Sequence, residues 1–244
     1  MIPFAILAGG LGTRLGSVTA TTPKALVTVA GRPFIDHQLT LLRDRGVERV
    51  VLCLGRLGAH VREYVGRGDR WGLRVDYSFD GPRLLGTGGA LRRALALLDD
   101  RFCVLYGDTY LDCDYRAVDL AHRRSGQPAL MTVFRNENRW DRSNVVFRDG
   151  RIARYSKADR TADMTYIDWG LGVLCASALS SHGPEEAFDL AIVYQELARQ
   201  DQLAGFEVQQ RFYEIGSPEG LVETEAFLLQ KELRASPDVT GQAR

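Results

Sequence analysis

The stretch Leu7-Ala-Gly-Gly-Leu-Gly-Thr-Arg-Leu15, followed by Thr22-Pro-Lys-Ala-Leu26, decides how the rest of this 244-residue chain is organised. The apolar residues 2–7 ahead of it are typical of a buried parallel strand that ends in a loop. Glycines allow positive φ and carry no side chain, so backbone N–H groups can approach a ligand closely. The candidate ligand-binding residues of this loop are Leu7, Ala8, Gly9, Gly10, Gly12 and Thr13.

Two cations accompany the glycine loop. Arg14 offers a planar guanidinium suited to forked contacts with phosphate oxygens, and Pro23 fixes the backbone before Lys24 and so helps to aim its ammonium group. The stretch lacks the Gly-Lys-Ser/Thr of a Walker loop, and Leu15 stands where a dinucleotide fingerprint requires Gly or Ala. Two cations beside such a loop therefore predict a polyphosphate site.

The composition excludes several classes of protein. With 45% hydrophobic and 25% charged residues the chain is an ordinary globular protein, and its formal net charge of zero gives no broad attraction to nucleic acid or to an anionic membrane. Its four cysteines are scattered without metal-ligand spacing, which argues against zinc. Because no apolar run reaches the roughly 20 residues that span a bilayer, and no signal peptide precedes the first strand, we expect a cytoplasmic protein.

Strands, turns and helices alternate through the first half of the chain. We expect strands at 2–7, 25–29, 49–54, 73–77 and 101–106, and helices after Pro33, around 59–65 and from the second glycine loop through Leu98. Such alternation implies an α/β fold with a doubly wound, mostly parallel sheet, and ligands then bind at the carboxyl ends of the strands.

The second half is richer in strands. We expect strands at 128–134, 166–174 and 205–208, a hairpin of 144–147 with 152–155, a helix at 188–199 and a final helix. Ser217 is the expected N-cap of that final helix, and Pro218 its first residue. We expect a single domain at 1–235 with a polar tail at 236–244.

The opening motif, together with Pro23-Lys24, resembles the signature of the sugar-1-phosphate nucleotidyltransferases, and the resemblance covers nearly the whole chain. It implies a Rossmann-like nucleotidyltransferase fold, a nucleoside triphosphate and a sugar 1-phosphate as partners, and release of pyrophosphate. Because both partners are polyanions, the resemblance also implies Mg²⁺ as cofactor. The chain looks most like the D-glycero-D-manno-heptose 1-phosphate guanylyltransferases, which use GTP to make GDP-heptose. The N-acetylmuramate 1-phosphate uridylyltransferases are nearly as similar, and the sequence leaves the oligomeric state open, a homo-oligomer included.

The resemblance assigns metal and nucleotide roles residue by residue. Asp108, after the strand at 101–106, matches the early metal ligand of the family, and Glu214 stands where many relatives carry a second one as Asp. The first glycine loop would bind the nucleotide, and Leu85-Gly-Thr-Gly-Gly89 resembles the base-recognition loop. The candidates there are Gly86, Thr87, Gly88 and Gly89. The alternatives are an Asp that caps a loop, a Glu that faces solvent and glycines that merely open a helix.

Three cations and a sugar pocket complete the implied site. Arg14 and Lys24 would bind the triphosphate and stabilise the transition state, and Lys157 would position the attacking phosphate. Relatives usually have Glu before that lysine, whereas this chain has Ser156. Asp168 and Gly170 match the Asn/Asp-x-Gly segment of the sugar pocket.

Two other kinds of function stay open at this point. The chain could transfer a cytidylyl group to a non-sugar phosphate such as phosphocholine, which would need an aromatic or acidic box for the quaternary ammonium. It could also be a non-catalytic subunit that binds nucleotide, although such a protein would be expected to lose some of Lys24, Asp108 and Glu214.

Overall fold

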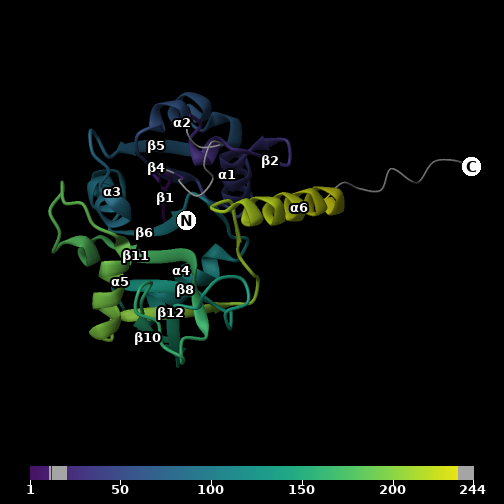
Figure 1. The fold of residues 1–244 in the computed structure, drawn as a ribbon. Coiled ribbons are helices and arrows are strands. Elements are labelled where there is room, and N and C mark those ends of the chain that lie inside the picture. Colours follow the sequence, from purple (N-terminus) through teal and green to yellow (C-terminus); the bar gives the residue numbers. More distant parts are fainter. Residues whose placement is uncertain (11, 13–20, 236–244) are drawn as a thin grey trace, which may run out of the picture.

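A nine-stranded sheet runs through the computed structural model of the chain, which describes residues 1–10, 12 and 21–235 (Figure 1). The described strands follow the order β5-β4-β1-β6-β11-β8-β12-β10-β9. The first half of the chain supplies four parallel neighbours: β5 (Arg74–Phe79), β4 (Arg49–Leu54), β1 (Phe4–Leu7) and β6 (Arg101–Tyr106). Apolar runs form β4, β1 and β6 because both faces of a parallel sheet are covered, whereas the edge strand β5 mixes apolar and polar residues.

The second half of the chain extends the same sheet. It adds β11 (Tyr166–Cys175), β8 (Ala129–Arg135), β12 (Leu203–Val208), β10 (Arg151–Tyr155) and β9 (Val145–Arg148). Among the described strands of this sheet only β11 and β10 run against the others, so the prediction of a mostly parallel sheet is confirmed. The predicted hairpin is confirmed too, with Asp149 and Gly150 at φ 48° and 76° in its turn.

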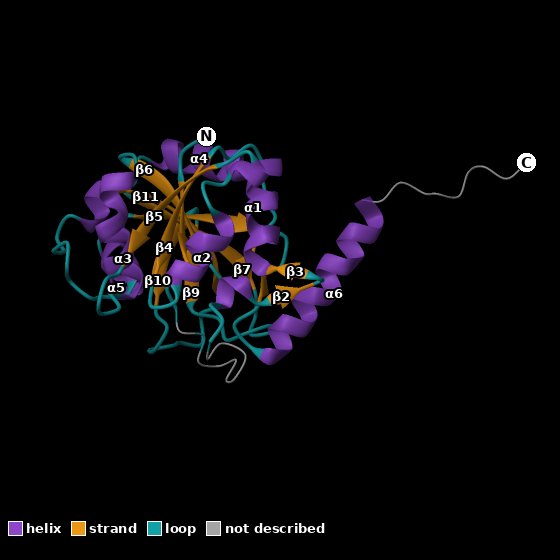
Figure 2. Cartoon of the chain, turned by 90° about the horizontal axis from the view of Figure 1, so that it is seen from above, coloured by secondary structure: helices purple, strands orange, loops and turns teal. Residues whose placement is uncertain are grey.

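Helices cover both faces of the sheet, as a doubly wound fold requires (Figure 2). One face carries α1 (Phe34–Asp44), α2 (Gly58–Val65) and α4 (Tyr115–Ser125), and the other carries α3 (Gly86–Ala94) and α5 (Leu190–Arg199). Short 3-10 turns lie at Asp69–Trp71, Leu95–Leu97 and Ala176–Leu179. Among the helices that the structure describes, none combines the length and apolar character needed to cross a membrane.

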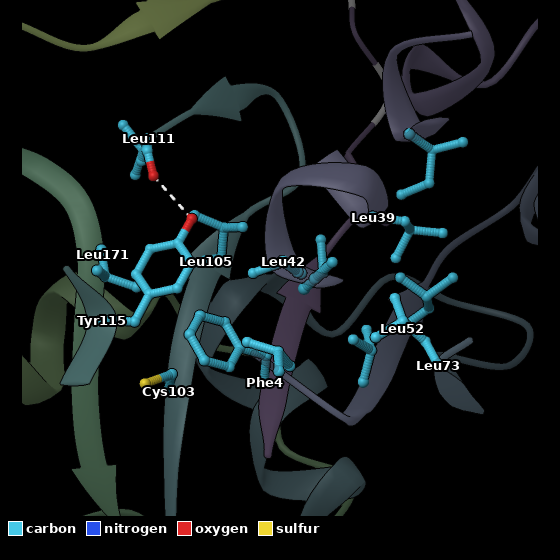
Figure 3. Packing of buried hydrophobic residues seen from close by; sticks show 14 of the residues in the cluster. Phe4, Leu39, Leu42, Leu52, Leu73, Cys103, Leu105, Leu111, Tyr115 and Leu171 are labelled. Carbon is cyan, nitrogen blue, oxygen red and sulfur yellow. Dashed lines mark hydrogen bonds between the residues drawn. The ribbon is translucent and has the colours of Figure 1, made fainter. Parts of the chain in front are cut away.

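The core on the α1 side fixes β1 and β6 in place. The ring of Phe4 on β1 lies 5.0 Å from that of Tyr115 on α4, and the Tyr115 hydroxyl donates to the Leu111 carbonyl at 2.7 Å (Figure 3). Both rings are fully buried. Each such side chain contributes about 1.5–3 kcal/mol through burial, so this packing holds α4 against β1.

The prediction of a strand at 25–29 is wrong in its first part. Lys24–Leu26 form a 3-10 turn, and only β2 (Thr28–Val29) is extended, pairing antiparallel with β3 (Arg32–Pro33). The tight turn between them holds Ala30 and Gly31 at φ 47° and 76°. Because α1 begins at Phe34, β3 has only two residues, and β2 therefore has a pairing partner for only two residues.

The last helix, α6 (Pro218–Ala235), begins as predicted and projects from the body of the protein (Figure 2). The Ser217 hydroxyl accepts the N–H of Gly220 at 3.0 Å, which is the bond of an N-cap. Just before it, β13 (Tyr213–Glu214) pairs antiparallel with β7 (Thr109–Tyr110). The predicted tail at 236–244 lies outside the described residues.

Candidate active site

A first pocket of about 230 Å³ opens where β1, β4 and β6 end. It brings together seven of the predicted nucleotide-binding residues with the predicted catalytic Lys24 and the predicted metal ligand Asp108. The seven are Leu7, Ala8, Gly9, Gly10, Gly12, Gly86 and Thr87. Backbone bonds hold these strand ends side by side, with the N–H of Gly107 donating to the Leu7 carbonyl at 3.0 Å and that of Ala8 to the Cys53 carbonyl at 2.9 Å. Two predicted residues, Thr13 and Arg14, lie outside the described residues.

A second pocket of about 590 Å³ adjoins the first. Its walls come from β10 and β11, from the loop before β9 and from the segment that leads into α6. The predicted residues Lys157, Asp168, Gly170 and Glu214 all line it. Tyr106 and Asp108 line both pockets. Two ligands seated in the two pockets would therefore meet beside Asp108.

An ion pair occupies the junction of the two pockets. The Lys24 ammonium lies 2.7 Å from Asp108 Oδ2, with the lysine side chain 14% and the aspartate side chain 29% exposed. The Asp108 carbonyl also accepts the N–H of Ile215, which ties the junction to the start of α6. A lysine paired in this way can exchange its carboxylate for a phosphate oxygen, since an ammonium group has three donors.

Glu214 lies close in the fold to Asp108 because β13 pairs with β7. Its partner in the register is Thr109, the next residue after Asp108. Its carboxylate accepts the Ser217 hydroxyl at 2.5 Å and the N–H of Gly216, so it also closes the first turn of α6. Packing there is tight, because a Cβ on Gly220 would lie 1.9 Å from Glu214 Oε1.

These two carboxylates are a sparse donor set for a metal. Among the described residues no group of three or more His, Cys, Asp or Glu side chains could hold an ion. Magnesium, however, typically takes only one or two protein carboxylates and completes its shell with water and phosphate oxygens. Asp108 and Glu214, both lining the second pocket, fit that requirement.

The second glycine loop forms the first turn of α3, and its glycines divide into two kinds. Gly86 and Thr87 line the first pocket. The N–H groups of Gly88 and Gly89 instead donate to the Phe188 carbonyl at 3.0 and 3.3 Å, and a Cβ on Gly88 would lie 2.1 Å from the Phe188 ring. Neither of these two is among the described residues that line the pocket, so they serve the close packing of α3 against the chain before α5.

Asp168 is held rigidly in the wall of the second pocket. Its Oδ1 accepts the N–H of Gly170 at 3.0 Å, and its Oδ2 lies 3.4 Å from the Tyr155 hydroxyl. Burial raises the pKa of Asp168, an effect that the Gly170 N–H opposes. Gly170 has φ 97°, a conformation that favours glycine, and the backbone N–H of Asp168 donates to the Asn144 side chain at 2.9 Å.

Lys157 points to a partner that sequence reasoning did not assign. Its ammonium lies 3.1 and 3.2 Å from the two carboxylate oxygens of Asp189, the N-cap of α5. The sequence showed only that a helix begins near this aspartate.

Asp80 is the other functional candidate that sequence reasoning missed. It follows β5, is 6% exposed and lines the first pocket, and its Oδ2 accepts the N–H of Leu85 at 3.2 Å. Burial raises the pKa of Asp80, against the effect of that N–H. An aspartate shortly beyond a predicted strand was the available signal; Asp108 shares that position, but the family resemblance assigned its role.

Comparisons with known proteins bear on the family and the fold of the chain. The family model described as nucleotidyl transferase matches residues 5–147, more than half of the chain. A D-glycero-alpha-D-manno-heptose 1-phosphate guanylyltransferase from Campylobacter jejuni is 26% identical over 215 residues, which are 88% of this chain and 94% of the relative. An N-acetylmuramate alpha-1-phosphate uridylyltransferase from Caulobacter vibrioides is 29% identical over 237 residues, 92% of this chain and 96% of the relative. The crystal structure of HddC from Yersinia pseudotuberculosis complexed with GMP-PN matches with a TM-score of 0.78 at 25% identity, covering 93% of this chain and 100% of that one.

Proposed function

Because the chain belongs to the nucleotidyl transferase family, we propose that it joins a nucleoside triphosphate to a sugar 1-phosphate and releases pyrophosphate. The observation that carries this proposal is the pair of pockets that share Tyr106 and Asp108. The first pocket has a glycine-rich wall and Lys24, as a triphosphate requires, and the second has Lys157 and Asp168, as a phosphorylated sugar requires.

The reaction needs alignment and charge neutralisation rather than a covalent nucleophile. An oxygen of the sugar phosphate attacks the α-phosphorus, and the bond from that phosphorus to the β-phosphate oxygen breaks, so that pyrophosphate leaves with the electron pair. In this proposal Lys24 and Arg14 bind the triphosphate and stabilise the charge that develops on it, while Lys157 holds the attacking phosphate. The glycine loop supplies backbone donors.

We assign Asp108 and Glu214 as the residues that would hold Mg²⁺. When bound, the ion supplies charge neutralisation and polarises the α-phosphate. Asp108 would then exchange Lys24 for the metal, which frees the ammonium group for a phosphate oxygen. Glu214 would keep one of its two hydrogen bonds to the start of α6, so its ligand position would be set by that helix.

For the sugar we propose D-glycero-D-manno-heptose 1-phosphate. The similarity to a heptose 1-phosphate guanylyltransferase over 94% of its length supports this choice. The second pocket is the larger of the two, and Asp168 offers carboxylate oxygens to sugar hydroxyls at its wall. An ionised carboxylate is an acceptor only, which suits a polyol.

For the base we propose guanine, and Asp80 is the specific observation in its favour. Guanine carries adjacent N–H donors on N1 and N2, and one carboxylate can accept both. Uracil has a single N–H between two carbonyl groups, which a carboxylate would repel. The second candidate, UTP with N-acetylmuramate 1-phosphate, rests on the similarity to the Caulobacter enzyme.

Pyrophosphate release with Mg²⁺ tests the proposal directly. GTP, UTP, CTP, ATP and dTTP would be combined with the 1-phosphates of heptose, mannose, glucose and N-acetylmuramate. We expect turnover with GTP and the heptose phosphate, and Asp80→Asn should reduce the preference for GTP over UTP by about tenfold or more, because a misplaced buried hydrogen-bonding group is costly. Turnover with UTP and N-acetylmuramate 1-phosphate would refute the substrates while keeping the reaction. No turnover with any sugar 1-phosphate would refute the reaction itself.

A further inference from the structure

A single carboxylate connects a residue of each pocket. Asp189 Oδ1 accepts the hydroxyl of Thr87, from the first pocket, at 3.0 Å. The same side chain binds Lys157, from the second pocket, at 3.1 and 3.2 Å. Thr87 belongs to α3 and Lys157 follows β10, so the carboxylate joins segments that are about 70 residues apart in the chain.

The anchor of this carboxylate is rigid. Asp189 caps α5 by accepting the N–H of Ala191 at 2.8 Å, and the N–H of Leu190 donates to the Thr87 hydroxyl at 2.8 Å. The neighbouring Phe188 carbonyl accepts two N–H groups of α3. Helices α3 and α5 contact each other on the same face of the sheet (Figure 2). The position of Asp189 is thus fixed relative to the first pocket.

Among the described residues, the hydrogen-bond partner of the Lys157 ammonium group is Asp189. The Lys157 side chain is 44% exposed, and a lysine side chain carries four rotatable bonds. The direction of its ammonium group is therefore set by what it binds. Against the desolvation that burial imposes, the Ala191 N–H and the Lys157 ammonium hold the pKa of Asp189 below its ordinary value, so the carboxylate is ionised when it binds the lysine.

We propose that Asp189 is a positioning residue that fixes the Lys157 ammonium relative to the nucleotide pocket, so that the attacking phosphate is aligned with the α-phosphate. The inference rests on the proposed function, since it concerns the sugar phosphate that Lys157 would bind. This role has a cost, because the negative charge of Asp189 then lies beside the site of the anionic sugar phosphate. Asp189 therefore weakens binding of the sugar phosphate while it improves alignment.

Because Asp189 would weaken binding and improve alignment, Asp189→Asn should change KM and kcat in a distinctive way. Asparagine is a good N-cap and can still accept the Ala191 N–H and the Thr87 hydroxyl, so the helix and the α3 contact should persist. We expect KM for the sugar 1-phosphate to fall by about two- to fivefold, the range for a half-exposed charge pair. We expect kcat to fall by about tenfold because the lysine loses its orientation, and KM for the triphosphate to change less than twofold.

The matched control is Asp114→Asn, which makes the same substitution at the N-cap of α4, where Asp114 accepts two N–H groups of the first turn. It should leave kcat and KM for the sugar 1-phosphate unchanged. The decisive variant is the double substitution of Asp189→Asn with Lys157→Ala, in which the effect of Asp189→Asn on KM should disappear. The inference would be overturned if Asp189→Asn raised KM for the sugar 1-phosphate while it lowered kcat, or if its effect on KM were the same in the Lys157→Ala background. Either result would leave the proposed reaction intact. Absence of wild-type turnover would instead refute the proposed function and the inference with it.

Discussion

Replacement of Lys24 by methionine tests the junction of the two pockets. The substitution keeps the length of the side chain but removes the ammonium group that lies 2.7 Å from Asp108. Exposed ion pairs contribute about 0–1 kcal/mol, and breaking a buried pair costs about 3–5 kcal/mol. With side chains 14% and 29% exposed the pair lies between these limits, and we expect a loss of about 1–2 kcal/mol. For a chain of this length that corresponds to a fall in Tm of about 2–8 °C.

The effect of Lys24→Met on turnover should be much larger than its effect on stability. Removal of one preorganised charge from a transition state costs about 10²–10³ in kcat, measured by pyrophosphate release at saturating substrates. Lys24→Arg is the informative control, because a guanidinium can bind Asp108 with two donors and should restore Tm. It should not restore kcat, since the two hydrogen bonds of the guanidinium to Asp108 are broken less readily than the single bond of the lysine. Wild-type kcat in the methionine variant, or an unchanged Tm in the absence of ligands, would refute the role of this pair.

Three further predictions concern packing, pH and metal. Gly88→Ala places a Cβ 2.1 Å from the Phe188 ring, so thermal unfolding should show a loss of about 1–3 kcal/mol. The same change at Gly10, where an added Cβ would meet no atom of the described residues within 4 Å, should be nearly neutral. Burial raises the pKa of Asp168 above its unfolded value, so ionisation of this group lowers the free energy of unfolding as pH rises from the unfolded pKa through the folded one. Asp168→Asn should flatten that pH dependence and raise Tm at pH 7, while KM for the sugar 1-phosphate rises about tenfold through the lost charged acceptor. Chelation with EDTA should abolish turnover, and added Mg²⁺ should restore it; activity in excess EDTA would contradict the metal assignment.

The strands that carry the site could be predicted because their sequences allow few alternatives. The runs at 49–54 and 101–106 became β4 and β6 with the predicted bounds, since residues buried on both faces of a parallel sheet are nearly all apolar. The stretch at 25–29 was harder. Its β-branched residues favour a strand, but the 3-10 turn at Lys24–Leu26 and the short hairpin with β3 depend on tertiary contacts.

The partners of the site residues could not be predicted from local pattern. Gly88 follows a glycine motif, yet the reason for its glycine is the ring of Phe188, a hundred residues later in the chain. Asp80 and Asp189 stand at the ends of elements where an aspartate is ordinary, and only the fold shows that one lines the first pocket and the other binds Lys157. Sequence pattern identified Lys24, Asp108 and Lys157 as charged residues of the site but not Asp80 or Asp189, because long-range packing decides which charges face each other.

The lysines of the chain illustrate this last point. Only three are present, and each lies against an aspartate: Lys24 with Asp108, Lys157 with Asp189 and Lys231 with Asp112. The third pair joins α6 to the body, and neither of its residues lines either pocket, so no phosphate oxygen competes with Asp112 for the lysine. The other two line the pockets, where phosphate oxygens can replace or share the carboxylate. A chain without net charge could thus bind two polyanions, because Lys24 would exchange Asp108 for a phosphate oxygen and Lys157 would share its ammonium group between Asp189 and a phosphate, so that neither lysine is desolvated alone.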